Sequence, residues 1–159
     1  MQELLDLLEH DPMKPREDLA RMLNLSLEEV LEKIAKLEAD GVIVEYQTVI
    51  NRDKWSPDLV TSLVEVRITP ERDGGFNRIA ARIAKFDEVQ SCYLMSGGYD
   101  LLIQLEAGNL REVADFVARK LSTIEGVVST ATRFRLQTYK ENGTFYAEEL
   151  APERLAVSP

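Results

Sequence analysis

The spacing of the apolar residues changes once along the chain, and this change constrains the fold more than any other feature. Up to about residue 41, apolar residues recur every three or four positions, which is the period of an amphipathic helix. From residue 60 onward, segments of alternating apolar and polar residues, typical of strands, are interleaved with helical segments. A chain of 159 residues is long enough for two small domains, so the change predicts a helical domain followed by an α+β domain.

The first predicted domain, residues 1–50, contains three short helices. Their apolar residues place them at 2–10, 16–23 and 26–40, and prolines in "DPMKP" separate the first helix from the second. A leucine- and isoleucine-rich stripe on the third helix is predicted to face the core: Leu27, Val30, Leu31, Ile34 and Leu37.

The junction between the second and third helices has the sequence of a tight turn. Asn24 tolerates a left-handed backbone, and Ser26 followed by Glu29 forms a capping box. Gly41 suits the end of the third helix. A helix, a tight turn and a capped helix predict a helix-turn-helix, and "VIVEYQTVI" (42–50) predicts a short β-wing after it.

The second predicted domain, residues 60–140, follows a polar linker at 51–59 that contains the proline of "NRDKWSP". Its elements are predicted as a strand at 60–68, a loop at 69–75, a helix at 76–86, strands at 89–95 and 100–106, a helix at 110–124 and a strand at 127–140. This βαββαβ order is the ferredoxin-like arrangement, with two helices on one face of an antiparallel sheet. The uncovered face predicts dimerisation or a bound ligand, and residues 141–159 are predicted to form a tail.

Composition excludes several classes of function. One histidine (His10) and one cysteine (Cys92) cannot form a zinc site of the usual kind or a histidine-based nucleophilic triad, so no metal and no cofactor are expected. A single cysteine excludes an internal disulfide and fits a reducing cytosol. The acidic, amphipathic N-terminus is not a signal peptide, and no apolar run could span a bilayer. A cytoplasmic location is predicted.

Two segments carry a resemblance to a known family. The segment "LNLSLEEVLEKIAKLEADGVIVEY" (23–46) and the segment "YLMSGGYDLLIQLE" (93–106) are similar, in this order and separation, to two motifs of the Lrp/AsnC ("feast/famine") transcriptional regulators. The resemblance covers about residues 2–140. It implies a regulator that binds promoter DNA through an N-terminal winged helix-turn-helix. It also implies a small effector, typically an amino acid, at an oligomer contact of the C-terminal domain, in a homo-dimer that assembles into higher oligomers.

The resemblance assigns the effector to the glycine-rich hairpin of the second motif. Glycines let the backbone approach a carboxylate, while Asp100 could pair with an α-ammonium group and Tyr99 could cover the side chain. The implied effector residues are Ser96, Gly97, Gly98, Tyr99, Asp100, Thr130 and Thr132. The alternative is a hairpin whose glycines serve only the turn and whose aspartate bonds local amides.

The DNA-binding residues follow from placing the third helix in the major groove. Its outward residues are Ser26, Glu28, Glu29, Lys33 and Lys36, and the phosphate candidates are Arg16, Arg21, Arg52 and Lys54. The balance of charge opposes this assignment. The chain has a net charge of −9, and residues 1–55 hold seven basic against thirteen acidic side chains. Several heads on one DNA could compensate through multivalency.

Two other functions compete with the regulator. The acidic head could contact a protein rather than DNA, which would leave a metabolite-binding module. Proteins that resemble this family also act as sirohaem decarboxylases, which would want a cavity lined by histidine and arginine. The second domain contains no histidine, so an enzyme is not expected. The sequence does not identify the effector, the target promoters, the direction of regulation or the oligomeric state beyond a dimer.

Overall fold

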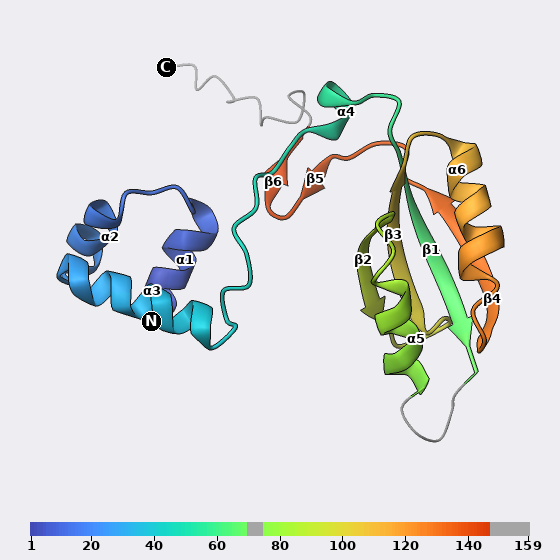
Figure 1. Ribbon diagram of the computed structural model, residues 1–159. Coiled ribbons are helices and arrows are strands. Elements are labelled where there is room, and N and C mark those ends of the chain that lie inside the picture. The colour runs from blue at the N-terminus through green and yellow to red at the C-terminus, as the bar shows by residue number, and fades with distance from the viewer. Residues whose placement is uncertain (70–74, 147–159) are drawn as a thin grey trace, which may run out of the picture. The chain divides into compact units, whose positions relative to one another are not determined.

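The computed structural model describes residues 1–69 and 75–146 of the chain (Figure 1). It divides the chain into two compact units, residues 1–49 and residues 50–159, and each unit has its own hydrophobic core. The loop residues 70–74 and the tail residues 147–159 lie outside the described residues.

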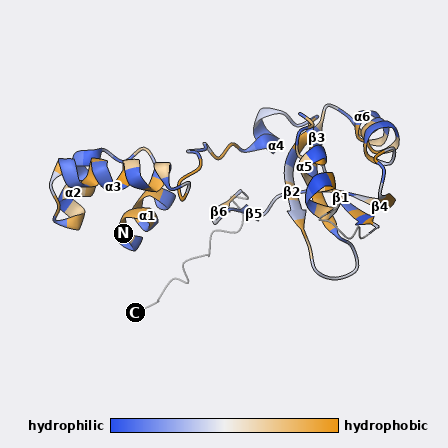
Figure 2. Cartoon of the chain, turned by 60° about the horizontal axis from the view of Figure 1, so that its bottom comes forward, coloured by the Kyte–Doolittle hydropathy of each residue, from blue (hydrophilic) through white to orange (hydrophobic). Residues whose placement is uncertain are grey.

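The first unit contains the three predicted helices, α1 (Gln2–His10), α2 (Arg16–Leu23) and α3 (Leu27–Ala39). Apolar and hydrophilic residues alternate along these helices, as Figure 2 shows, so each can bury one side. Their shared core consists of Leu4, Leu8, Leu19, Ala20, Val30, Ile34 and Leu37. The predicted stripe is wrong at two positions, because Leu27 and Leu31 are 39% and 47% exposed.

The turn between α2 and α3 confirms the predicted helix-turn-helix. Asn24 adopts a left-handed backbone with φ of 53°, and the Leu25 amide donates to the Ala20 carbonyl at 2.9 Å. The capping box is present. The Ser26 hydroxyl accepts from the Glu29 amide at 3.2 Å, and the Glu29 carboxylate accepts from the Ser26 amide at 2.8 Å. Gly41, just after the helix, has φ of 69°, which favours glycine.

The predicted β-wing is not formed. Residues 44–50 carry no regular secondary structure, although their composition suits a strand. A strand needs a hydrogen-bonding neighbour, and the described part of the chain pairs no strand with this segment. Val44 is accordingly 89% exposed.

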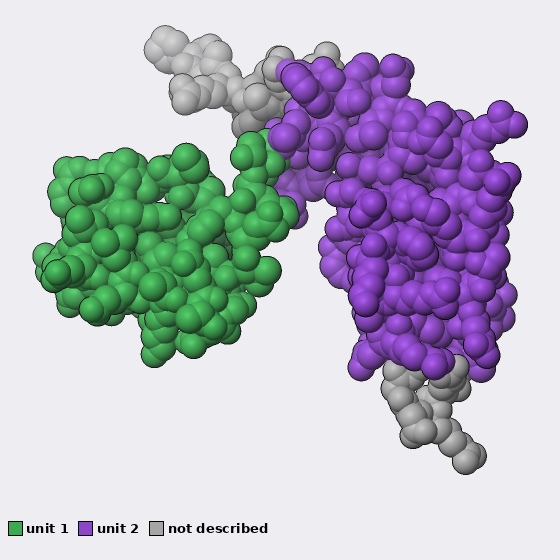
Figure 3. Space-filling model, viewed as in Figure 1, with its two compact units in different colours: residues 1–49 green, residues 50–159 purple. Residues whose placement is uncertain are grey.

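The second unit confirms the ferredoxin-like fold. Its elements are β1 (Val60–Ile68), α5 (Gly75–Ile83), β2 (Val89–Leu94), β3 (Leu101–Ala107), α6 (Leu110–Asp115), the π-helical turn η1 (Phe116–Leu121) and β4 (Val127–Phe134). The four strands form one antiparallel sheet in the order β2-β3-β1-β4. Figure 3 shows this unit in purple.

Helices α5 and α6 cover the same face of the sheet. Every second residue of β1 and β3 is buried on that face: Val64, Val66, Ile68, Leu101, Ile103 and Leu105. Ile79 and Ile83 of α5 and Val113 of α6 pack against them. The opposite face carries the intervening residues of each strand, and within the described residues no helix covers it, although Arg135 covers Thr61 at one end.

Three segments differ from the predicted elements. The predicted linker contains a short helix, α4 (Arg52–Trp55), which Asn51 caps by accepting from the Lys54 amide at 3.1 Å. The predicted final strand stops at Phe134, which pairs with Ser62, because β1 begins only two residues before Ser62; one last bond runs from the Arg135 amide to the Thr61 carbonyl at 3.0 Å.

The start of the predicted tail forms a small hairpin. Strands β5 (Lys140–Glu141) and β6 (Thr144–Phe145) are joined by Asn142 and Gly143, which have φ of 47° and 80°. Two consecutive residues with positive φ make the tight turn that Asn-Gly favours in hairpins. Residues 140–146 are therefore ordered structure rather than tail.

We expect Ser62→Ala to stabilise the second unit. Ser62 is fully buried, and within the described chain its hydroxyl has no hydrogen-bond partner. Removing an unsatisfied buried hydroxyl should raise the free energy of unfolding by about 1 kcal/mol, measured by urea denaturation. Thr61→Val is the matched control, because the Thr61 hydroxyl accepts from Arg135 at 3.1 Å and its loss should destabilise. A less stable Ser62→Ala protein would contradict the prediction.

Candidate functional site

The outward face of α3 presents fewer free polar groups than the sequence indicates. Glu28 and Lys36 are exposed and Lys33 is half-buried. Ser26 and Glu29 are also exposed, but they bond to one another in the capping box. These hydrogen bonds from Ser26, with a smaller contribution from Lys33, hold the pKa of Glu29 below its ordinary value.

The phosphate candidates are held by other protein groups. The Arg16 guanidinium lies 5.9 Å from the centre of the Tyr46 ring and is partly buried. Arg21 forms an ion pair with Asp18, and Arg52 pairs with Glu106 at 3.7 Å. Lys54 is exposed on α4. Contact with phosphate would require Arg21 or Arg52 to exchange its carboxylate for a DNA oxygen.

Some apolar side chains of the helix-turn-helix are exposed, which the sequence did not predict. Leu27 and Leu31 lie one turn apart on α3, and Met22 of α2 is 58% exposed. Apolar groups on a reading helix can contact the methyl group of thymine. The sequence holds no signal for this exposure, because Leu27 and Leu31 occur at the same helical spacing as the buried residues of α3.

In the second unit, the predicted effector hairpin is a tight turn fixed to β1. The Met95 amide donates to the Asp100 carbonyl at 2.8 Å, which closes the turn. Gly97 has φ of 126°, a conformation that requires glycine, while Ser96, Gly97 and Gly98 are exposed. The Gly98 carbonyl accepts from Arg67 Nε at 2.8 Å.

Asp100 is bound to backbone on both sides. Its amide donates to the Val66 carbonyl at 2.9 Å, and its Oδ2 accepts from the Ile68 amide at 2.8 Å. Pairing between β1 and β3 ends at Val66, so the carboxylate continues the ladder where β3 has turned away. This geometry matches the alternative reading, in which Asp100 serves the turn.

Thr130 and Thr132 lie on β4, opposite Val66 and Val64 of β1. The hairpin lies on the other side of β1, because Asp100 also bonds Val66. Neighbouring strands are about 4.8 Å apart, so roughly 10 Å separates these threonines from the hairpin backbone. The structure therefore places them at one end of the sheet without direct contact within one chain.

A charged pair on the open face lies near the hairpin and was not among the predicted site residues. Arg133 of β4 donates to Glu65 of β1 through Nε at 2.7 Å and Nη2 at 3.3 Å. This pair lowers the pKa of Glu65 and raises that of Arg133, to which Tyr99 adds a small effect. The register of β1 and β4 creates the pair, and the sequence does not specify that register.

The described residues contain no cluster of three or more side chains that could hold a metal ion. Within the same residues, no helix has both the length and the hydrophobicity needed to cross a membrane. What this geometry offers chemically is hydrogen bonding and ion pairing rather than covalent chemistry.

The chain is similar to proteins that are already known. The family model described as the Lrp/AsnC ligand binding domain matches residues 61–145. A protein of Bacillus subtilis (strain 168) named as the HTH-type transcriptional regulator YugG is 39% identical over 158 residues, which cover 99% of this chain and 95% of the relative. A leucine-responsive regulatory protein of Rhizobium meliloti is 30% identical over 87% of this chain and 88% of its own length.

Solved structures show the same fold at lower identity. The Escherichia coli AsnC structure has a TM-score of 0.69 and 20% identity, and covers 87% of this chain and 91% of its own. A transcriptional regulator from Neisseria meningitidis, solved as a complex with L-Met, has a TM-score of 0.72 and 22% identity, and covers 92% and 94% of the two chains.

We expect Asp100→Ala to cost about 1 to 2 kcal/mol in the free energy of unfolding, because it leaves the Ile68 amide without its acceptor. Asp100→Asn keeps an oxygen acceptor and should cost less. Urea denaturation measures both. Equal costs for the two variants would contradict the hydrogen-bonding role of Asp100.

The pKa of Glu65 should depend on Arg133. Because folding lowers the pKa of Glu65, its contribution to stability is complete above the unfolded value of about 4.3 and is lost as the pH falls through the folded value. Arg133→Met should raise the pKa of Glu65, measured by NMR titration of its carboxyl carbon, whereas Lys85→Met, in the turn after α5, should not. An unchanged pKa in Arg133→Met would refute this account.

Proposed function

Because this chain belongs to the Lrp/AsnC family of transcriptional regulators, we propose that it binds promoter DNA through its helix-turn-helix and a small effector through its C-terminal unit. The observation that carries the proposal is the combination of a capped helix-turn-helix with a ligand-binding domain in a chain that matches a named regulator along 99% of its length. The proposed effector is an amino acid, since a structural neighbour binds L-Met.

We assign DNA contact to α3 and its surroundings. Lys33 and Lys36 supply positive charge on the reading helix, with Glu28 beside them. Arg16, Arg21, Arg52 and Lys54 are the proposed phosphate contacts, and Ser26 and Glu29 are the cap that shapes the helix start. Because most of these cations already have acidic or aromatic neighbours, each head should bind weakly, and an oligomer would add the effective concentration that tight binding needs.

We assign the effector to the end of the sheet that carries the hairpin. Ser96, Gly97 and Gly98 offer exposed backbone, Tyr99 and Asp100 are half-buried beside it, and Thr130 and Thr132 lie across β1. In one chain these groups do not enclose a ligand. A neighbouring subunit that packs against this end of the sheet would complete the site, so the proposal includes a homo-dimer that assembles further.

The proposed domain boundaries are residues 1–50 for DNA binding, 51–59 for the linker and 60–140 for ligand binding and oligomerisation. A regulator must reach DNA, so we propose a cytoplasmic location. The alternative of an acidic head that contacts protein is not favoured, because the relatives reported above are named as transcriptional regulators. The same names argue against the decarboxylase alternative, and the chain is not an enzyme.

The test is titration of the full-length protein against the DNA upstream of its own gene, at two salt concentrations, with and without a panel of amino acids. We expect binding that weakens with salt and changes with one or more amino acids. Lys36→Ala should lower the affinity and reduce the salt dependence by about one counterion.

Lys85→Ala is the matched control for the DNA experiment, because it removes the same charge from an exposed position in the turn after α5, in the C-terminal unit. Its affinity for DNA should be that of the unchanged protein. Absence of binding at low salt, with amino-acid binding intact, would overturn the proposed regulator and favour the protein-binding head.

A further inference from the structure

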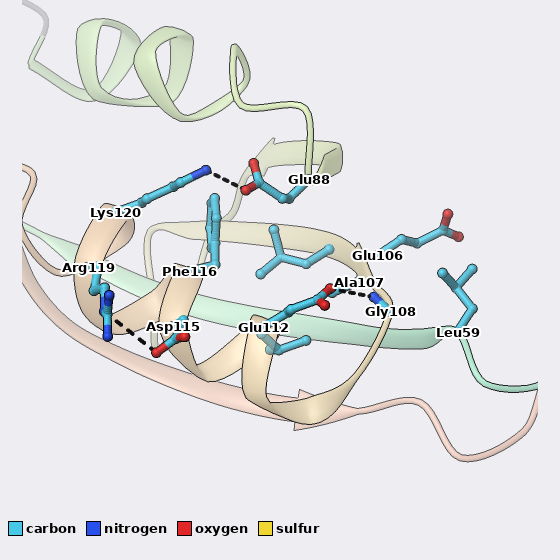
Figure 4. Close-up of a pocket in the computed structure, with 12 residues that line it drawn as sticks. Leu59, Glu88, Glu106, Ala107, Gly108, Glu112, Asp115, Phe116, Arg119 and Lys120 are labelled. Carbon is cyan, nitrogen blue, oxygen red and sulfur yellow. Dashed lines mark hydrogen bonds and ion pairs between the residues drawn. The ribbon is translucent and has the colours of Figure 1, made fainter.

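A groove of about 560 Å³ lies in the second unit, beside α6 and the end of β3 (Figure 4). Its floor is apolar and is formed by Leu105 of β3 with Val113 and Phe116 of α6 and η1. Leu59, just before β1, closes one side. This volume lies within the range of clefts that hold small molecules.

The groove is distinct from the predicted effector hairpin. Strand β3 begins at Leu101, next to the hairpin, and ends at Ala107, which lines the groove. A strand rises about 3.3 Å per residue, so roughly 20 Å separates the two places. A ligand of the size of an amino acid cannot occupy both.

Two irregular elements shape the walls of the groove. The helix that carries Phe116, Arg119 and Lys120 changes from α to π geometry at Phe116. On the opposite wall, the register of β2 against β3 shifts between Val89 and Ser91, directly after Glu88. Both π-helical turns and β-bulges are frequent next to functional sites, where they redirect side chains.

The charges at the rim leave one carboxylate without a cation. Lys120 pairs with Glu88 across the groove, as the dashed line in Figure 4 shows, and Asp115 pairs with Arg119 at 3.6 Å. Glu112 instead accepts neutral N–H groups, from Gly108 N and Asn109 Nδ2, each at 2.8 Å. Within the described chain, no ion pair compensates the charge of Glu112.

We propose that this groove binds a small molecule that carries an ammonium group and a short branched apolar chain. The ammonium contacts Glu112 at the rim, and the chain covers Leu105, Val113 and Phe116. This chemistry is shared by apolar α-amino acids and the corresponding amines. The inference rests on the proposed function, in that a second site matters to a protein that senses such molecules.

The experiment uses full-length protein carrying Tyr99→Ala, which impairs the hairpin. Isothermal titration calorimetry compares L-leucine, 3-methylbutylamine and 4-methylpentanoate, which carry the same branched chain with both charges, the ammonium alone and the carboxylate alone. We expect the two ammonium compounds to bind once per chain and the acid not to bind. Equal affinity for leucine and the amine would identify amines as the ligand class. Tighter binding of leucine than of the amine would identify α-amino acids as the ligand class.

Glu112→Gln should weaken both ammonium ligands by roughly tenfold or more, since it removes the charge but keeps an oxygen for the Gly108 amide. Glu125→Gln is the matched control, because it removes the same charge from an exposed position outside the groove. Ala107→Leu fills the groove without changing its charge and should also abolish binding, with a thermal melt to confirm folding. Binding that persists in Glu112→Gln, or no binding of either ammonium compound, would overturn the inference.

The two proposals fail separately. A protein that binds DNA and responds to amino acids through the hairpin, but whose Glu112→Gln variant is unchanged in the Tyr99→Ala background, retains the proposed function and loses the groove. A protein that binds ammonium ligands in the groove but no DNA at low salt loses the proposed function and keeps the groove.

Discussion

Burial of one face of the four-stranded sheet under α5 and α6 is the constraint on which the second unit depends. Alternate residues of β1 and β3 must be apolar to fill that core, and the strand geometry then directs the intervening residues to the opposite face. The hairpin, the Glu65–Arg133 pair and the groove all occur where this two-layer arrangement ends or remains uncovered. The core therefore determines where the hairpin, the charged pair and the groove can lie.

The helices and the strand order were predictable because their signals are local. The capping box at Ser26, the apolar spacing of α1 and α2, and the alternation in β1 each lie within a few residues. The bond from Asp100 to Ile68 and the pairing of Arg133 with Glu65 join residues more than thirty positions apart, and depend on strand register. The Asn142-Gly143 turn was a local signal that the prediction missed, and the wing failed because it needs a partner.

The hairpin and the groove lie at opposite ends of β3, and this relation has a thermodynamic meaning. Two sites on one rigid strand are coupled only if the ligands favour different states of the protein, and the coupling must then be equal in both directions. The register shifts between β1 and β4 and between β2 and β3, which lie near the hairpin and the groove respectively, are the places where the sheet departs from regular pairing. They are the elements in which two alternative arrangements are easiest to build.

The ion pair between Arg52 and Glu106 bears on the distance between the helix-turn-helix and the second unit. The ion pair links α4 to the end of β3. The segment without regular secondary structure that precedes α4 is then the seven residues from 44 to 50. When fully extended, a segment of that length spans about 25 Å. This is shorter than the one turn of the double helix that separates adjacent half-sites. Each subunit of a dimer would contribute one such segment, so the two together could span the one turn between half-sites and would allow more than one operator spacing.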